Sequence, residues 1–299
     1  MTIIKIKKHT RNEGEINVKS HDRVIQPKKA SSGSRQILIS PELSTQKEIN
    51  HSLKKSKQKI NEKLNSEDKR VIKQVLKDFK IGRDTKYLHS IKGKYTPTRQ
   101  KIHNNIIQST LKQDRITKYP DLYMLGGVAS SGKTSALSKK IHEKAVIVNN
   151  DDIKSALAKV TPSPSKRFEL IHAPLLHRES KDIENEIIRR LKLTKKDIIF
   201  DRTISDYDKN LKMIKEFEKL GYEINTLATN LKPHVAVKRA SKRFLDPNEN
   251  GRYVPIEKIG NGGNQINKNV LKLAKNKINK KAYVVNTYHR KKQKVIFEK

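Results

Sequence analysis

The chain of 299 residues contains no cysteine. Disulfide bonds and zinc sites with cysteine ligands are therefore excluded, and a cytosolic setting is permitted. Hydrophobic residues make up only 34% of the chain and aromatic residues 5%, so we expect a hydrophobic core beside segments that pack poorly. No apolar run approaches the roughly 20 residues that a membrane span needs. Residues 1–8 alternate isoleucine with lysine instead of forming the apolar block of a signal peptide.

Acidic residues are scarce relative to basic ones. The chain has 67 lysines and arginines against 31 aspartates and glutamates, a formal net charge of +36. Half of this net charge lies in residues 1–118, which are well under half of the chain. So positive a field attracts polyanions, which makes nucleic acid, including a packaged phage genome, a candidate partner. Non-specific attraction without a biological role is the alternative.

A phosphate-binding motif, G-x-x-x-x-G-K-[ST], occurs at residues 127–134 as GVASSGKT. Its glycines allow successive backbone N–H groups to point at one anion. Lys133 can reach the β- and γ-phosphates of ATP or GTP, and the Thr134 hydroxyl can hold Mg²⁺. The residues predicted to bind the nucleotide are Gly127, Ser130, Ser131, Gly132, Lys133, Thr134 and Ser135.

Apolar runs alternate with helical patterns around and after this motif. Strands are expected at residues 122–125, 145–148, 197–201, 223–228, 282–287 and 294–297, and helices at 134–143, 175–191, 205–220, from 233 onward and at 264–278. Such alternation predicts a parallel sheet with helices on both faces. Together with the motif, it predicts an α/β fold of the P-loop NTPase, kinase type.

The chain divides into three parts by composition. Residues 1–45 are expected to form a flexible basic arm, residues 46–118 a basic helical extension, and residues 119–299 the P-loop kinase domain. Within the extension, helices are predicted at residues 66–82 and 98–111. Because every candidate site residue lies beyond residue 118, we expect the chain from about residue 90 onward to fold and bind nucleotide alone.

Acidic residues end two of the predicted strands, where ligands meet an open α/β sheet. Asp151 follows the strand at 145–148 and could cap a helix, which is compatible with acting as a general base, and Asp152 could exchange roles with it. Asp201 ends the strand at 197–201. Arg243 and Arg252 could close over bound phosphates, or could be a surface cation and a turn residue. His103 is expected to pack, and the spacing of His172 and His177 excludes a metal pair on one helical face.

Five segments, in order, resemble the zeta toxin family. They are the P-loop with its preceding strand, the strand ending in Asn150-Asp151, His177-Arg178-Glu179-Ser180, Phe200-Asp201-Arg202-Thr203, and Arg243 with Gly251-Arg252-Tyr253-Val254-Pro255. The family usually has glycine at the position of Arg202. The segment from Tyr95 to Arg99 is similar to the corresponding part of phage-encoded members. The resemblance extends from about residue 95 to the end and leaves residues 1–90 unexplained.

This resemblance implies transfer of the γ-phosphoryl group of ATP or GTP to a sugar hydroxyl of a nucleotide-sugar or related small molecule. It implies a general base at Asp151 and phosphoryl-neutralising cations at Lys133, Arg243 and Arg252. Thr134 would bind Mg²⁺, and Asp201 would orient the acceptor or a metal-bound water. An antitoxin or virion proteins would be further partners, in the host cytoplasm or, for a phage-encoded protein, in the virion; no membrane is implied.

Two other functions remain open. A polynucleotide kinase would share the P-loop and account for the charge, although no segment matches its acceptor site. In a basic virion or genome-associated protein with a P-loop fold, residues 1–118 would carry the function in place of the kinase site. The presence of Lys133, Thr134 and Asp151 argues against a kinase fold that has lost its activity.

Overall fold

A computed structural model of the chain describes residues 40–112, 116–136, 141, 143–246, 249 and 251–288, and the backbone of 294–298. These residues belong to one compact unit, residues 37–299. Most of the arm expected over residues 1–45 lies outside the described residues. In the described part of the chain, every helix is too short or too polar to cross a membrane.

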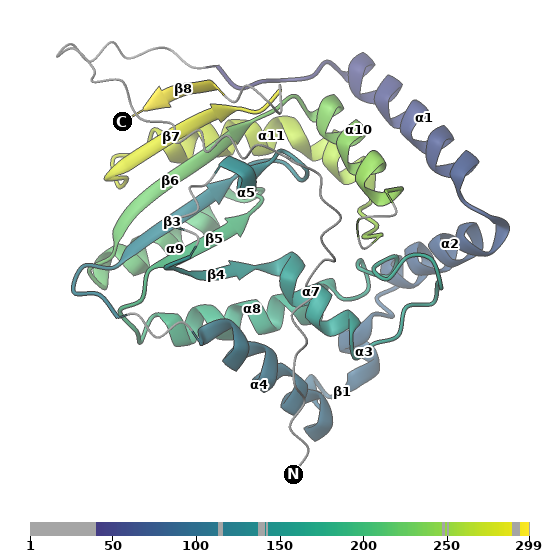
Figure 1. Cartoon of the computed structure of the whole chain (residues 1–299), viewed down its shortest axis with the longest axis horizontal. Helices are drawn as coiled ribbons and strands as arrows, with labels where there is room; N and C mark the ends of the chain where they lie inside the picture. The colour runs from purple at the N-terminus through teal and green to yellow at the C-terminus, as the bar shows by residue number, and fades with distance from the viewer. Residues whose placement is uncertain are drawn as a thin grey trace, which may run out of the picture. The chain divides into compact units, whose positions relative to one another are not determined.

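A six-stranded sheet with the order β4-β5-β3-β6-β7-β8 carries the fold (Figure 1). Its strands are β3 (Asp121–Gly126), β4 (Val146–Asn149), β5 (Ile198–Arg202), β6 (Glu223–Asn230), β7 (Lys281–Asn286) and β8 (Lys294–Glu298). Strands β4, β5, β3, β6 and β7 are parallel, as predicted. Strand β8 is antiparallel to β7, because strands joined by so few residues pair in that sense.

The apolar residues of β3 are buried on both faces of the sheet. Leu122 and Met124 belong to the main hydrophobic core, and Leu125 belongs to a smaller cluster with Ala145 and Ile199. Since successive strand residues point to opposite faces, the two clusters lie on opposite sides of β3. The helices that follow the strands are α5 (Lys133–Ala136), α7 (Asn150–Ala158), α8 (His177–Leu191), α9 (Tyr207–Lys219), α10 (Pro233–Phe244) and α11 (Ile256–Ala274).

The region before the P-loop is not a separate body. Its elements are α1 (Gln46–Lys63), α2 (Ser66–Lys80), α3 (Thr85–His89), the hairpin β1 (Ser90–Ile91) and β2 (Lys94–Tyr95), and α4 (Pro97–Leu111). Helix α1 packs along α10, and α4 packs on α8 (Figure 1). The domain boundary expected between residues 118 and 119 therefore does not divide the compact unit.

The end of the expected arm is held in place. Asn230 Oδ1 accepts from the Glu42 amide at 2.8 Å, and Asn264 Oδ1 accepts from the Ser44 amide at 2.9 Å. Asn267 Nδ2 donates to the Glu42 carbonyl at 2.6 Å. These side chains satisfy the backbone of an extended segment that has no strand partner. The described last residues of the arm are therefore fixed, contrary to the flexible arm expected up to residue 45.

Helix α11 begins at Ile256, earlier than the expected start at residue 264. Three glycines in its first half, at 260, 262 and 263, disfavour a helix by intrinsic propensity. Two of them allow close packing instead. A Cβ on Gly263 would lie 2.6 Å from Pro233 of α10, and one on Gly260 would lie 3.0 Å from Ile49 of α1. Tertiary contacts thus outweigh helix propensity here.

Candidate active site at the phosphate-binding loop

The predicted P-loop joins β3 to α5 and depends on positive φ angles. Gly132 has φ +84° and Ser130 has φ +60°. A Cβ on Gly127 would lie 2.0 Å from Thr229 Oγ1, so only glycine fits between the loop and β6. Ser131 is buried, and its hydroxyl oxygen lies 2.5 Å from that of Thr229. The side chain of Ser131, a residue predicted to bind the nucleotide, therefore fastens the loop to β6.

Lys133, Thr134 and Asp201 meet at the ends of neighbouring strands. Asp201 on β5 lies beside Leu125 on β3, so its carboxylate reaches the first turn of α5. Lys133 Nζ lies 3.6 Å from Asp201 Oδ1, and Thr134 Oγ1 donates to Asp201 Oδ2 at 3.3 Å. Asn149 Nδ2 donates to the same oxygen at 3.2 Å. The three predicted residues therefore form one charged cluster, in which Lys133 is already engaged by a carboxylate.

Asp151 lies at the start of α7, and Asn149 caps this helix by accepting from the Asp151 amide at 2.8 Å. Asp151 is therefore not the N-cap, and both of its carboxylate oxygens are available for ion pairs. Arg252 NH1 lies 2.5 Å from Oδ2, and Lys154 Nζ lies 3.5 Å from Oδ1. Burial raises the pKa of Asp151, but Lys154, Arg252 and Lys133 lower it by more, so the net shift is downward.

Arg252 is fixed by the loop that precedes α11. Gly251 has φ +62°, and a Cβ there would lie within 2.9 Å of Phe168, backbone included. Tyr253 donates its amide to the Leu170 carbonyl at 3.2 Å. The Arg252 side chain is 12% exposed, and its Nε is buried without a hydrogen-bond partner. A buried donor of this kind costs free energy as long as it has no partner.

An aromatic cluster supports this loop from behind. Phe244 stacks on Phe168 with 4.8 Å between ring centroids and meets Tyr253 edge-on at 5.3 Å. Leu64, which follows α1, is buried in the same cluster, and residues of α2 pack against it. The segment that precedes the P-loop in sequence therefore helps to position Arg252.

Arg243, at the end of α10, lies farther out than Arg252. Its side chain is 41% exposed, and its Nε lies 3.0 Å from Glu249 Oε2. It lines the same cleft as the P-loop. Arg243 therefore reaches the site without the fixed position of Arg252.

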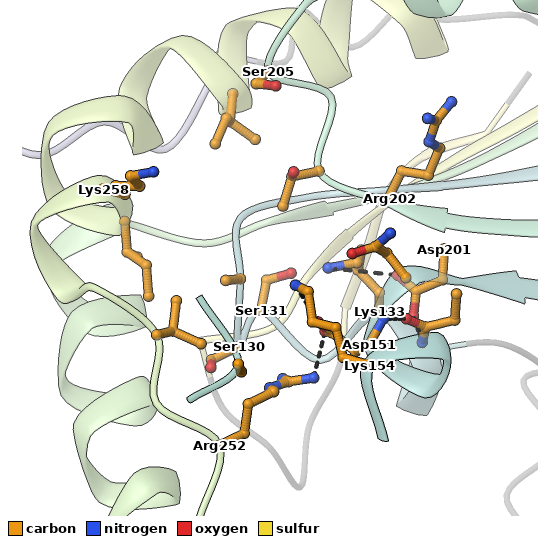
Figure 2. Close-up of a pocket in the computed structure, with 18 of the residues that line it drawn as sticks. Ser130, Ser131, Lys133, Asp151, Lys154, Asp201, Arg202, Ser205, Arg252 and Lys258 are labelled. Carbon is orange, nitrogen blue, oxygen red and sulfur yellow. Dashed lines mark hydrogen bonds and ion pairs between the residues drawn. The ribbon is translucent and has the colours of Figure 1, made fainter. Parts of the chain in front are cut away.

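All five predicted catalytic residues, Lys133, Asp151, Asp201, Arg243 and Arg252, line one cleft of about 1460 Å³. Figure 2 shows Arg252, Asp151 and Lys154 together beside the P-loop residues. Pockets for a single small ligand usually measure roughly 300–1,000 Å³. The cleft thus has room for a nucleotide and a second substrate. From the sequence alone, Arg243 could be a surface cation and Arg252 a turn residue. In the structure both line the cleft.

Several cleft residues were not predicted from the sequence to be site residues. Lys154, Lys181 and Arg202 line it, as does Glu184, whose side chain is only 1% exposed. Glu184 accepts from Lys181 Nζ at 2.5 Å and lies 3.1 Å from Arg202 NH2. Arg202, where the family usually has glycine, is thus paired beneath the cleft. Only the three-residue spacing between Asp151 and Lys154 on one helix could have indicated such a residue.

Glu179, the acid of the family-like His-x-Glu-Ser segment, does not line the cleft. It is fully buried and accepts from Arg99 Nε at 2.5 Å and from Arg99 NH2 at 2.9 Å. His103 Nε2 lies 2.6 Å from it. Glu179 therefore joins α8 to α4, and His103 contacts this carboxylate away from the cleft.

The residues suit a magnesium ion that is held largely by phosphate oxygens. Mg²⁺ prefers oxygen ligands and usually binds to one or two protein groups together with substrate phosphates and water. Thr134 Oγ1 and Asp201 offer such oxygens beside Lys133. Among the described residues, no three histidine, aspartate or glutamate side chains form a metal cluster. A protein-only metal cage is therefore not available in this part of the chain.

Comparison with solved structures finds a similar fold at low sequence identity in the AvrRxo1 complex. The complex AvrRxo1-ORF1:AvrRxo1-ORF2 with sulphate ions is 16% identical, with a TM-score of 0.55 over 68% of each chain. The same complex with ATP is 17% identical, with a TM-score of 0.52 over 69% of this chain and 68% of that one. A structure from the PezAT toxin–antitoxin system of Streptococcus pneumoniae is 15% identical over 69% of this chain and 83% of that one, with a TM-score of 0.49.

No curated protein matches the sequence significantly. A family model does: the one described as "Zeta toxin" matches residues 105–299, which is well over half of the chain. The matched range includes the P-loop, Asp151, Asp201 and both arginines. All of these residues line the cleft. The chain therefore belongs to the zeta toxin family of P-loop kinases.

Proposed function

We propose that this protein transfers the γ-phosphoryl group of ATP or GTP to a sugar hydroxyl of a nucleotide-sugar or a related small molecule. The observation that carries the proposal is the ion pair between Asp151 and Arg252 inside the P-loop cleft. A carboxylate and a phosphate-binding cation lie in contact there, beside Lys133. Phosphoryl transfer requires placed cations and a placed acceptor more than covalent help from the protein.

The reaction assigns a task to each charged residue of the cleft. The acceptor oxygen attacks the γ-phosphorus, the bond from that phosphorus to the bridging oxygen breaks, and the nucleoside diphosphate leaves with the bonding electrons. The acceptor proton passes to an oxygen of Asp151. Lys133 and the two arginines, Arg243 and Arg252, stabilise charge on the transferring group. Asp201 would orient the acceptor or, with the metal ion bound, a water beside it.

The proposed cofactor is Mg²⁺. Thr134 would hold it, with Asp201 beside it. When bound, the ion would neutralise phosphate charge. ATP is the nucleotide to test first, because one structural neighbour was solved with ATP. GTP remains the second nucleotide.

Three further kinds of partner are proposed from the family and from the charge. An antitoxin chain is one, since the family model is that of a toxin; virion proteins are another. Nucleic acid is the third, attracted by the excess of lysine and arginine. Polynucleotide kinase activity, or a role as a basic phage virion or genome-associated protein, is the alternative function.

The test is a transfer assay with the full chain, Mg²⁺ and γ-labelled ATP or GTP. One set of acceptors is nucleotide-sugars, and the other is oligonucleotides with free 5′-hydroxyl ends. Label on a nucleotide-sugar supports the proposal. Label on oligonucleotide ends alone replaces it with the polynucleotide kinase function. Nucleotide binding without transfer to either set would contradict both.

A further inference from the structure

Lys154 lies beside the proposed base but has no role in the function described so far. It is on α7, three residues after Asp151, and lines the cleft with it (Figure 2). Its side chain is 14% exposed, and its Nζ lies 3.5 Å from Asp151 Oδ1. Burying a lysine costs free energy unless its charge is paired. The position of this ammonium group therefore calls for a functional explanation.

The two oxygens of Asp151 have partners of different kinds. Lys154 holds Oδ1 from the same helix, so the two groups move together. Arg252 holds Oδ2 from the loop before α11, and its Nε is a buried donor without a partner. An arginine with an unpaired donor is stabilised when two phosphate oxygens accept hydrogen bonds from it in a bidentate arrangement. Arg252 is thus the exchangeable partner of Asp151, and Lys154 the resident one.

The surroundings of Lys154 leave Asp151 as its main source of stabilisation. Burial lowers the pKa of Lys154, and Arg252 and Lys181 lower it further, whereas Asp151 raises it. On α8, the neighbouring Lys181 is engaged by Glu184 at 2.5 Å. His177, also on α8, has a pKa lowered to about 4 by burial and by nearby lysines, so it adds no charge at neutral pH.

We propose that Lys154 is a positioning residue for the general base. It holds Oδ1 of Asp151 and keeps the carboxyl group ionised, while Arg252 moves from Oδ2 to the transferring phosphoryl group. Oδ2 is then free to accept the proton of the acceptor hydroxyl. The inference rests on the proposed kinase function and adds an order of events: the nucleotide releases Oδ2 before the acceptor can use it.

The test compares Lys154→Met with Lys154→Arg in the full chain. Methionine keeps much of the length and removes the charge. An opposite charge at this distance lowers a carboxyl pKa by roughly 1–3 units. Lys154→Met should therefore raise the pKa of Asp151 and move the acid limb of the kcat–pH profile upward by about 1 unit or more. Lys154→Arg should keep the limb within about 0.3 unit of the wild type, well inside that shift.

Lys181→Met is the matched control, because it removes a second cleft lysine from the neighbouring helix. Glu184 pairs with Lys181, and Lys181 is not among the groups that shift the pKa of Asp151 most. Its acid limb should therefore stay in place, whatever its kcat. Equal shifts in both methionine variants would reduce the effect to the general field of the cleft and overturn the inference.

Calorimetry with a non-hydrolysable ATP analogue separates failure of this inference from failure of the proposed function. Lys154→Met should bind the analogue within about threefold of the wild type, which also confirms its fold. An active wild type with an unshifted acid limb in Lys154→Met overturns the positioning role alone. A wild type that binds the analogue but phosphorylates no acceptor overturns the proposed function, and the base role with it.

Discussion

Lys133 and Asp151 lie in the same cleft but should affect different steps. Lys133 belongs to the P-loop and is paired with Asp201. Its ammonium group is suited to the β- and γ-phosphates. We expect Lys133→Ala to lose both ATP-analogue binding and phosphoryl transfer. Calorimetry and the labelled-phosphate assay measure the two properties, and full transfer activity in this variant would exclude the P-loop as the nucleotide site.

Asp151→Asn should remove transfer without weakening nucleotide binding. The amide keeps the shape of the carboxyl group but cannot accept a proton, and a lost general base typically costs about 10²–10⁴-fold in rate. Arg252 also loses its ion pair in this variant, so it becomes free for phosphate. The same calorimetry and transfer assay apply. Transfer at the wild-type rate would move the base role to Asp152 or Asp201.

The low pKa of Asp151 sets the direction of its pH dependence. Because burial is outweighed by Lys154, Arg252 and Lys133, the carboxyl group stays ionised well below neutral pH. A base must be deprotonated to act, so its contribution is lost only as pH falls through this lowered pKa.

Asp151 and its family-like neighbours could be predicted from sequence. Lys154 could not, because its importance depends on a loop about a hundred residues later.

Helices α4 and α8 are joined by a buried charge pair, which gives a prediction for stability. Arg99 and Glu179 are 4% and 0% exposed. Removing one member of such a pair leaves a buried charge uncompensated and typically costs about 3–5 kcal/mol. We expect Glu179→Gln to lower the free energy of unfolding by about that amount, as measured by urea denaturation.

Glu186→Gln is the control on the same helix. Glu186 pairs with Arg189 and Arg190, but its side chain is 31% exposed. Exposed pairs contribute about 0–1 kcal/mol, so this variant should stay near the wild type.

Burial opposes ionisation of Glu179, but hydrogen bonds from His103 and Arg99 lower its pKa to about 2. Its stabilisation is therefore full above the unfolded pKa and is lost as pH falls through about 2. Equal losses in both variants would contradict the buried-pair interpretation.

The sequence predicted helices and strands where a single hydrophobic periodicity dominated the segment. The strands at 122–125 and 197–201 and the helix at 175–191 correspond to β3, β5 and α8. The early start of α11 was not, because its glycines are tolerated only where Ile49 and Pro233 approach them. Helix α3 and the β1–β2 hairpin are too short to produce a periodic signal. The sequence therefore missed a helix start that depends on distant contacts and elements too short to show a period.

The charge of the whole molecule predicts salt-sensitive binding to nucleic acid. The net charge is +36, and every phosphate neutralised by lysine or arginine releases a counterion. We expect the full chain to bind DNA of unrelated sequences with similar affinity, falling steeply between about 50 and 200 mM salt. Residues 37–299 should show a shallower salt slope, because they lack part of the basic arm. Identical slopes in a fluorescence-anisotropy salt series would contradict a role for the arm.

The chain before the P-loop should be required for the nucleotide site, contrary to the expectation from sequence that residues from about 90 onward suffice. Leu64 is buried in the aromatic cluster behind Arg252, and Phe79 lines the cleft. Asp68 on α2 accepts from Ser165 and Arg167 at 2.8 Å each. Removing these partners would loosen the Arg252 loop. We therefore expect residues 37–299 to bind the ATP analogue like the full chain, and residues 90–299 to bind it at least tenfold more weakly or to fail to fold.

A point variant in the full chain separates the loop's support from the loss of a whole segment. Leu64→Ala removes one buried side chain from the aromatic cluster, and such changes typically cost about 2–5 kcal/mol. Ile81→Ala, at a position 53% exposed just after α2, should cost less than about 1 kcal/mol. Urea denaturation measures both variants, and the transfer assay should follow the same order because Arg252 is positioned through this cluster. Wild-type analogue binding by residues 90–299, with Leu64→Ala as active as Ile81→Ala, would show that the P-loop unit positions its arginine unaided.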